Sequence, residues 1–281
     1  MNDAIYFKAL QIKSKIRNPN QILDRSSHEV IEATFMKQAE KEIKDLDIQK
    51  VKYTYPTDIN YPDQFRQMLE PPLFLEYLGE PVWNNFELIS VVGSRRIHPF
   101  TQDWLKTEFQ NFLAHKDQIA VVSGGAEGVD QWAHWVSLSL SRPTIVVLPT
   151  GLGKIYPRSL ESMKETVLKN KGCFLSEFPF SWSVKKSHFY FRNRIIAALG
   201  EMCLVAQAQI KSGTFLTVHH ALQNGRPILT IPAHPLMSDF SGNLNLISEG
   251  ALSVQNYSDM LNLWDAEFWS GRVFNHKENC I

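Results

Sequence analysis

The sequence predicts an α/β protein with a Rossmann-like fold: a mainly parallel sheet with helices on both faces, preceded by a small helical N-terminal region. Six short apolar runs show no polar alternation, which indicates strands buried on both faces. Stretches of helical character lie between most of these runs, and alternation of strands with helices is typical of a parallel sheet built from βαβ units. A mixed sheet with an antiparallel edge is the alternative.

The expected elements follow from these runs. The strands are Leu88–Val92, Ile119–Val122, Thr144–Leu148, Cys173–Leu175, Met202–Val205 and Ile228–Ile231. The helices between them are Thr101–Ala114, Gly128–Leu140, Leu160–Lys169 and Thr214–Asn224.

We expect three regions along the chain. Residues 1–55 form a helical N-terminal region, because Glu29 to Lys44 is rich in helix formers. Residues 56–255 form the Rossmann-like domain, which is approached through a turn-rich segment at 51–85 with Tyr61-Pro62 and Pro71-Pro72. Residues 256–281 form a C-terminal tail with a closing helix, and a strand or two follows Ala251.

The composition limits the possible functions. Lys+Arg and Asp+Glu both number 29, so the net charge is zero and any surface that binds nucleic acid must be a local patch. Cys173 and Cys203 lie in apolar runs and are expected in the core, and Cys280 has no close partner in sequence. Without a long apolar run or a leader pattern, we expect a cytoplasmic protein without membrane contact.

Several predicted strands end in loops suited to phosphate. Glycine permits close approach, serine can donate, and arginine or lysine matches phosphate charge. Because carboxyl ends of parallel strands share one sheet edge, these loops should converge there. The loop residues are Gly93, Ser94, Arg95 and Arg96; Ser123, Gly124 and Gly125 before a helix start whose free amides favour an anion; Lys154 and Arg158; and Lys211, Ser212, Gly213 and Thr214.

One further run combines aromatic and basic residues. In His188-Phe189-Tyr190-Phe191-Arg192-Asn193-Arg194, an aromatic such as Phe191 could stack on a base while the arginines pair with phosphates. The alternative is a loop with aromatics packed inward and Asn193 as a helix N-cap. Glu177 is expected to pair with an arginine such as Arg192, and Asp130 to order a helix start.

At this point the residues resemble the DNA-processing protein A family, also called Smf, over about residues 60–251. Its motifs occur in the family's order, and Phe191-Arg192-Asn193-Arg194-Ile195-Ile196-Ala197 is the most specific of them. Others are Gly93-Ser94-Arg95, Gly128-Val129-Asp130, Tyr156-Pro157, Ser212-Gly213-Thr214 and Ser241-Gly242-Asn243. Three departures are Glu127, where the family often has a basic or neutral residue, Gln207 for a glutamate, and Ala233 for a glycine.

The resemblance implies an extended Rossmann fold in a homodimer that binds single-stranded DNA with little sequence preference. It also implies protection of incoming DNA in natural transformation, and transfer of that DNA to the recombinase RecA. By matching positions, Arg95 would correspond to the family's glycine-loop arginine, and Arg158 falls where the family typically has a DNA-contacting lysine after Tyr-Pro. Arg192, Asn193 and Arg194 match the family directly. The printed sequence ends without the winged-helix domain that many members carry.

We therefore expect a binding protein and not an enzyme, with no cofactor and no metal. His134 is expected to pack in the interior. The alternative is a nucleotide-binding sensor or a phosphoribohydrolase-like enzyme. Such hydrolases share a Pro-Gly-Gly-x-Gly-Thr-x-x-Glu run; here Thr217 stands three residues after Thr214, in place of the glutamate.

Overall fold

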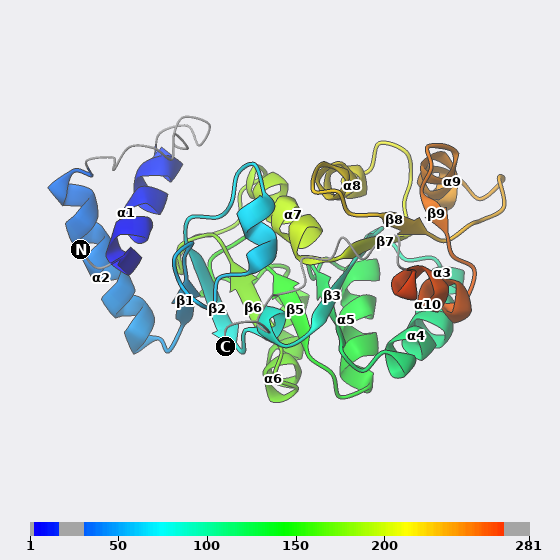
Figure 1. Cartoon of the computed structure of the whole chain (residues 1–281), viewed down its shortest axis with the longest axis horizontal. Helices are drawn as coiled ribbons and strands as arrows, with labels where there is room; N and C mark the ends of the chain where they lie inside the picture. Colours follow the sequence, from blue (N-terminus) through cyan, green and yellow to red (C-terminus); the bar gives the residue numbers. More distant parts are fainter. Residues whose placement is uncertain (1–2, 17–30, 267–281) are drawn as a thin grey trace, which may run out of the picture.

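The computed structural model describes residues 3–16 and 31–266. Its strands form one sheet in the order β1-β2-β6-β5-β4-β3-β7-β8-β9 (Figure 1). The strands are β1 (Lys52–Thr54), β2 (Leu75–Gly79), β3 (Glu87–Gly93), β4 (Ile119–Ser123), β5 (Thr144–Val147), β6 (Cys173–Ser176), β7 (Met202–Gln207), β8 (Ile228–Thr230) and β9 (Leu252–Ser253). The helices are α1 (Asp3–Ile16), α2 (Ala33–Ile48), α3 (Pro99–Trp104), α4 (Gln110–His115), α5 (Val129–Ser139), α6 (Glu161–Lys169), α7 (His188–Leu199), α8 (Thr214–Gln223), α9 (Ser241–Ser248) and α10 (Tyr257–Asp265).

The sheet confirms the predicted fold class in its mixed form. Strands from β6 across to β9 pair in parallel. At one edge β2 is antiparallel to β6, and β1 is antiparallel to β2. All six predicted strands and the four predicted helices are present. The segment 51–85, expected to be only turn-rich, contains β1 and β2, so that prediction is incomplete.

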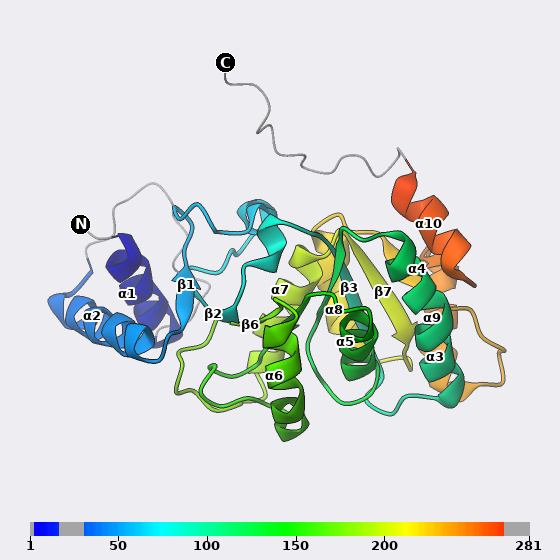
Figure 2. The same ribbon diagram turned by 90° about the horizontal axis from the view of Figure 1, so that it is seen from below.

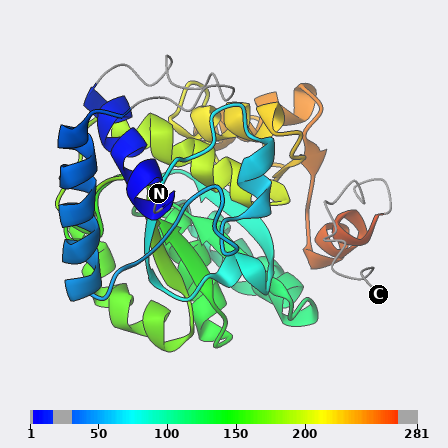
Figure 3. The ribbon, with the colours of Figure 1, turned by 60° about the vertical axis from the view of Figure 1, so that its left-hand side comes forward.

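Two layers of helices cover the sheet. Helices α7, α8 and α9 pack on one face. Helices α4, α5, α6 and α10 pack on the other, and Figure 2 shows them from that side. Helices α1 and α2 lie side by side next to the β1 edge (Figure 3). Cys173 and Cys203 are buried in the core as predicted, and Cys280 lies outside the described residues.

The strand order creates a crevice beside β3. After β3 the chain builds β4, β5 and β6 on one side, then crosses to form β7, β8 and β9 on the other. The connections leaving β3 and β7 therefore diverge at adjacent carboxyl ends, which is where open α/β sheets bind ligands. In the part of the chain that the structure describes, no helix is both long and apolar enough to cross a bilayer.

Candidate functional site

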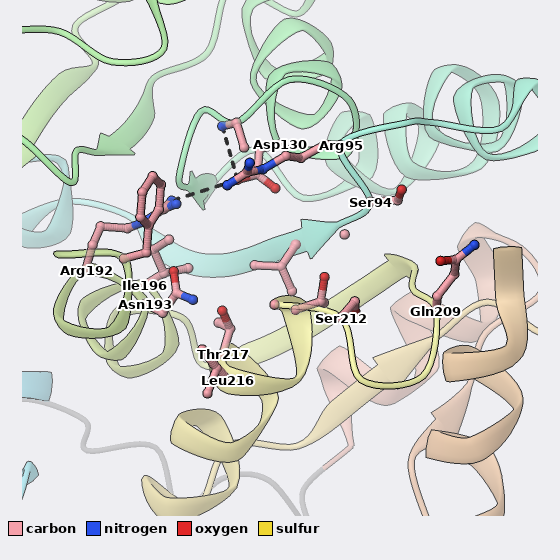
Figure 4. Close-up of a pocket in the computed structure, with 16 residues that line it drawn as sticks. Ser94, Arg95, Asp130, Arg192, Asn193, Ile196, Gln209, Ser212, Leu216 and Thr217 are labelled. Carbon is pink, nitrogen blue, oxygen red and sulfur yellow. Dashed lines mark hydrogen bonds and ion pairs between the residues drawn. The ribbon is translucent and has the colours of Figure 1, made fainter. Parts of the chain in front are cut away.

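A pocket of about 320 Å³ opens at the crevice between β3 and β7 (Figure 4). We call it the switch-point pocket. Its walls come from the loop after β3, the start of α5, one face of α7, and the loop that leads from β7 into α8. The lining residues are Val92, Gly93, Ser94, Arg95, Ala126, Asp130, Phe189, Arg192, Asn193, Ile196, Gln209, Ser212, Gly213, Thr214, Leu216 and Thr217.

A smaller cleft of about 90 Å³ adjoins this pocket, and we call it the Tyr156 cleft. Arg95, Ala126, Phe189 and Arg192 line both cavities, so these four residues form the partition between them. The other lining residues of the cleft are Gly124, Glu127, Pro149, Tyr156 and Pro157. A polymeric ligand could therefore place one monomer in the switch-point pocket and the next in the Tyr156 cleft, on the two sides of this partition.

The partition is a stack of two cations on one ring. Arg95 Cζ lies 5.5 Å and Arg192 Cζ 5.8 Å from the centroid of the Phe189 ring. Tyr156 packs edge to face on that ring, with centroids 6.1 Å apart and planes at 75°. An arginine over an aromatic face is attracted by the ring quadrupole, which holds both guanidinium groups at this position.

Arg192 supplies a buried cation with free hydrogen-bond donors. Its side chain is 6% exposed, and Asp130 Oδ2 lies 3.9 Å from Nη1, too far for a hydrogen bond. Within the described residues, Nε and Nη1 are buried and have no hydrogen-bond partner. Burial lowers the pKa of Arg192, and the Asp130 carboxylate opposes that shift. Unpaired buried donors cost free energy unless a ligand satisfies them, so the group favours an anion.

The Gly124 backbone leaves the space that Arg192 needs. A Cβ at this position would overlap Nη1 and Cζ of the Arg192 guanidinium. The glycine in the loop after β4 therefore has a steric role: it admits the arginine from α7 to the sheet edge.

Asp130 uses backbone donors of the same loop. Its carboxylate accepts a hydrogen bond from the Ala126 amide at 3.3 Å, which confirms that Asp130 orders this helix start (dashed in Figure 4). The Val129 amide donates to the Ser94 carbonyl at 3.1 Å. Burial raises the pKa of Asp130, while Arg192 and the amides of Ala126 and Gly124 lower it. These amides are already used, so an anion in the pocket must rely on Arg95, Arg192 and the α8 side.

The loop Gly93–Arg96 is fixed by Gln207, which is 1% exposed. The Gln207 carbonyl accepts from the Ser94 amide at 2.8 Å, and Oε1 accepts from the His98 amide at 2.8 Å. Nε2 donates to the Arg96 carbonyl at 3.2 Å. A glutamate could accept the same bonds but could not make this donation, so the amide form of the side chain matters here.

The β7–α8 loop completes the pocket. Lys211 adopts a left-handed backbone with φ of 63°. Ser212 Oγ is buried without a hydrogen-bond partner in the described chain. Gly213 and Thr214 follow at the N-terminus of α8, where backbone amides and the helix dipole favour negative charge.

The structure brings about half of the predicted site residues to these cavities. The lining includes Gly93, Ser94, Arg95, Gly124, Arg192, Asn193, Ser212, Gly213 and Thr214. Others are close in sequence to lining residues but line neither cavity: Arg96, Gly125, Lys154, Arg158, Phe191 and Lys211. Lys154 and Arg158 are exposed on the loop that carries Tyr156. Ser123 is buried and donates to the Val91 carbonyl at 2.6 Å.

The structure decides two points about α7. The helix begins at His188, so Asn193 lies in its interior, and the alternative that made it an N-cap is excluded. Glu177 pairs with an arginine as expected, but the arginine is Arg194, at 2.6 Å, and not Arg192. Arg194 also donates to the Glu70 carbonyl at 2.9 Å, so its guanidinium is used in packing outside the pocket. Residues three apart share a helix face, which puts Phe189 beside Arg192 and turns Arg194 away.

Sequence reasoning missed Phe189, the ring at the centre of the partition, and chose Phe191. Phe191 directly precedes Arg192 in sequence, but residues one apart on a helix do not face each other. Recognising the helix start at His188 would have pointed to Phe189, because it lies three residues before Arg192. Tyr156 and Gln209 were also missed as lining residues.

Fold and site together define a doubly wound α/β protein with a pocket lined by two arginines at its topological switch point. The sequence profile of the DNA recombination-mediator protein A family matches residues 52–265. The chain belongs to that family.

Named relatives agree with this assignment. The DNA processing protein DprA of Streptococcus pneumoniae is 32% identical over 72% of this chain and 70% of its own length. The protein Smf of Escherichia coli is 32% identical over 72% of this chain, which spans 53% of that relative.

Two solved structures have the same fold. That of DprA from S. pneumoniae has a TM-score of 0.72 and 28% identity, and the match covers 92% of both chains. A structure of DNA processing protein A from Helicobacter pylori, described for its single-stranded DNA binding mode, has a TM-score of 0.66. Its identity is 27%, over 76% of this chain and 95% of that one.

Proposed function

We propose that this chain binds single-stranded DNA along the carboxyl edge of its sheet. One observation carries the proposal: Arg95 lines the same pocket as the buried Arg192 guanidinium, whose Nε and Nη1 have no hydrogen-bond partner in the described chain. Phosphate oxygens are acceptors that match arginine donors in number and charge. Since phosphate contacts do not depend on the base, most of the affinity should be independent of sequence.

The size and lining of the cavities favour a single strand over a duplex. A pocket of about 320 Å³ accommodates a nucleotide-sized group and not the width of a double helix. Tyr156, which is 39% exposed, offers an aromatic surface beside the two arginines. Unpaired bases can stack on such rings, whereas bases in a duplex are already stacked. The H. pylori relative, whose structure concerns single-stranded DNA binding, supports this assignment.

Four further exposed cations are close in sequence to residues that line the cavities, and we propose that they guide the strand on either side. Lys154 and Arg158 lie on the loop of the Tyr156 cleft, and Arg96 and Lys211 lie near the switch-point pocket. We assign all the site residues predicted from the sequence to strand binding, with two exceptions. Ser123 supports the loops at the sheet edge, and Arg194 supports α7.

The biological role that we propose is protection of incoming DNA and its transfer to the recombinase RecA in the cytoplasm. The family is named for recombination mediation, and several relatives are named DNA processing proteins. We further propose a homodimer, which would place two pockets on one strand. Gel filtration tests the dimer against the monomer mass of 32.3 kDa.

Binding can be measured by fluorescence anisotropy with a labelled oligo-dT over a series of salt concentrations. Each neutralised phosphate contributes about −0.7 to the slope of log affinity against log salt on single strands. Arg95→Ala should weaken binding and flatten the slope by about that amount. Lys44→Ala, which removes an exposed cation on α2, is the matched control and should change neither. Equal binding by both variants and the unmodified chain would overturn the proposal.

The enzymatic alternative has less support from the site. Thr217 lines the switch-point pocket where the hydrolases have a glutamate. Asp130 is already engaged with the Ala126 amide and lies next to Arg192. We expect no release of free base when the protein is incubated with nucleoside monophosphates, and release of base would revive this alternative.

A further inference from the structure

Glu127 is an acidic residue in a cavity otherwise suited to anions. It lines the Tyr156 cleft together with Arg95 and Arg192. Its side chain is exposed, and it makes no ion pair with any other residue in the described ranges. A carboxylate repels phosphate, so this residue opposes the backbone contacts of a bound strand. A carboxylate at this position would attract a ligand group that carries hydrogen-bond donors.

The turn that carries Glu127 is held on both sides. Gly128 has φ of +84°, and a Cβ there would overlap the carbonyls of Ser94 and Arg95. On the other side, Gln131 Nε2 donates to the Gly125 carbonyl at 3.1 Å and to Ser159 Oγ at 2.8 Å. The turn is thereby fixed between the loop of Arg95 and the loop of Tyr156, so the backbone that carries Glu127 has a defined place beside the cleft.

The chemistry of the cleft is that of a base-recognition site. Tyr156 provides exposed aromatic surface, and a base stacked on it would direct its edge toward the surrounding polar groups. A carboxylate has two acceptor oxygens and no donor. Guanine presents two adjacent donors, N1–H and the 2-amino group, which match these oxygens as a pair. Thymine presents one donor between two carbonyl oxygens, and these would repel the carboxylate.

We propose that Glu127 makes the Tyr156 cleft selective for guanine in single-stranded DNA. The carboxylate accepts hydrogen bonds from guanine N1–H and from the 2-amino group, while Arg95 and Arg192 hold the adjacent phosphate. This inference rests on the proposed function. It adds a preference at one base position to binding that otherwise depends on the backbone.

The test compares three labelled oligonucleotides of equal length at one salt concentration: oligo-dT, oligo-dT with isolated guanines, and the same strand with hypoxanthine replacing guanine. Isolated guanines avoid quadruplexes, and hypoxanthine lacks only the 2-amino group. The unmodified protein should bind the guanine strand roughly five- to tenfold more tightly than oligo-dT, the lower range of a bidentate base contact. The hypoxanthine strand should fall between the two.

Glu127→Gln should abolish the guanine preference, because its amide group turns a donor toward the guanine donors. The same variant should bind oligo-dT more tightly, because one negative charge near the phosphates is gone. Glu165→Gln, an exposed change on α6, is the matched control and should keep the preference.

The outcomes separate the two proposals. Equal affinity of the unmodified protein for all three strands overturns the guanine preference and leaves strand binding intact. An equal gain on all three strands in Glu127→Gln also overturns it, because Glu127 would then act only by repelling phosphate. Failure to bind any strand overturns the proposed function and this inference together.

Discussion

The Arg192 guanidinium occupies the volume that any side chain at position 124 would fill. The glycine of the β4 loop and the arginine of α7 are thus one steric unit, although they are far apart in sequence. This explains how a glycine could contribute to the proposed phosphate site although the amides of its loop already bond Asp130. Gly124 matters because the Arg192 guanidinium lies against its backbone.

Gly124→Ala should therefore weaken binding of single-stranded DNA by displacing the guanidinium, which is the free end of a flexible side chain. We expect roughly a tenfold loss of affinity, comparable to the loss of one charge-assisted hydrogen bond. Anisotropy measures the affinity, and far-UV circular dichroism checks that the fold is kept. In a double-mutant cycle, Gly124→Ala combined with Arg192→Ala should be no worse than Arg192→Ala alone. Additive losses would show that Gly124 acts independently of Arg192.

A second residue-scale effect concerns pH. His134 is fully buried, with Nδ1 2.7 Å from Thr144 Oγ1, and burial lowers its pKa from 6.5 to about 3. Between these two values the unfolded chain binds a proton that the folded protein does not. Stability from this group is therefore complete above the unfolded pKa and is lost as pH falls toward the folded pKa.

Unfolding in urea at about pH 7 and at about pH 5 measures this effect. Between about pH 7 and about pH 5, His134→Gln should lose roughly 2 kcal/mol less free energy of unfolding than the unmodified chain, since a glutamine does not titrate. His219→Gln on the exposed face of α8 is the control. An identical acid dependence in all three proteins would contradict a buried, neutral His134.

At the scale of elements, the N-terminal helices are joined to the sheet by a buried polar cluster. Lys8 Nζ on α1 lies 2.7 Å from Glu76 Oε1 on β2, with both side chains 1% exposed. It also lies 3.2 Å from Glu42 Oε2 on α2. Gln11 donates to the carbonyls of Phe74 at 2.9 Å and Glu177 at 2.7 Å. These contacts orient α1 relative to the edge strand more specifically than apolar packing would.

Lys8→Met should destabilise the protein by about 3 kcal/mol, because a buried carboxylate loses its lysine. Lys52→Met is the matched control: its pair with Glu80 is 3.2 Å long but about half exposed, and its removal should cost less than about 1 kcal/mol. Denaturant unfolding measures both. Adding Glu76→Leu to Lys8→Met should restore part of the stability. If Lys8→Met costs no more than Lys52→Met, the buried pair does not stabilise the docking.

The elements also show what the sequence can reveal. Strands β3 to β8 are buried apolar runs, so their pattern is unambiguous. β1 has only three residues, with one exposed and one half-buried side chain, and it owes its place to pairing with β2. The start of α7 was hidden because the helix buries Arg192, Asn193 and Arg194 and because Ser187 makes no side-chain cap. Because these polar residues are buried, the periodicity of apolar residues did not predict that Phe189 and Arg192 form the partition.

At the scale of the whole molecule, a net charge of zero means that binding depends on where the cations lie. One pocket with Arg95 and Arg192 neutralises few phosphates, so a single protomer should bind a strand weakly. Two protomers that hold one strand would bind more tightly without any new contact, because the second pocket engages at high effective concentration.

This arrangement predicts a threshold in strand length. Affinity for oligo-dT should rise by at least about tenfold once the strand spans both pockets, a conservative value for linked sites. Below that length, affinity should grow only in proportion to the number of registers available. Anisotropy with oligo-dT of increasing length measures this, and gel filtration at the same concentrations establishes the dimer. Arg192→Ala should lower affinity on both sides of the threshold, because it weakens each pocket. A smooth, proportional increase over all lengths would mean that each protomer binds independently, and the two-pocket arrangement would have to be abandoned.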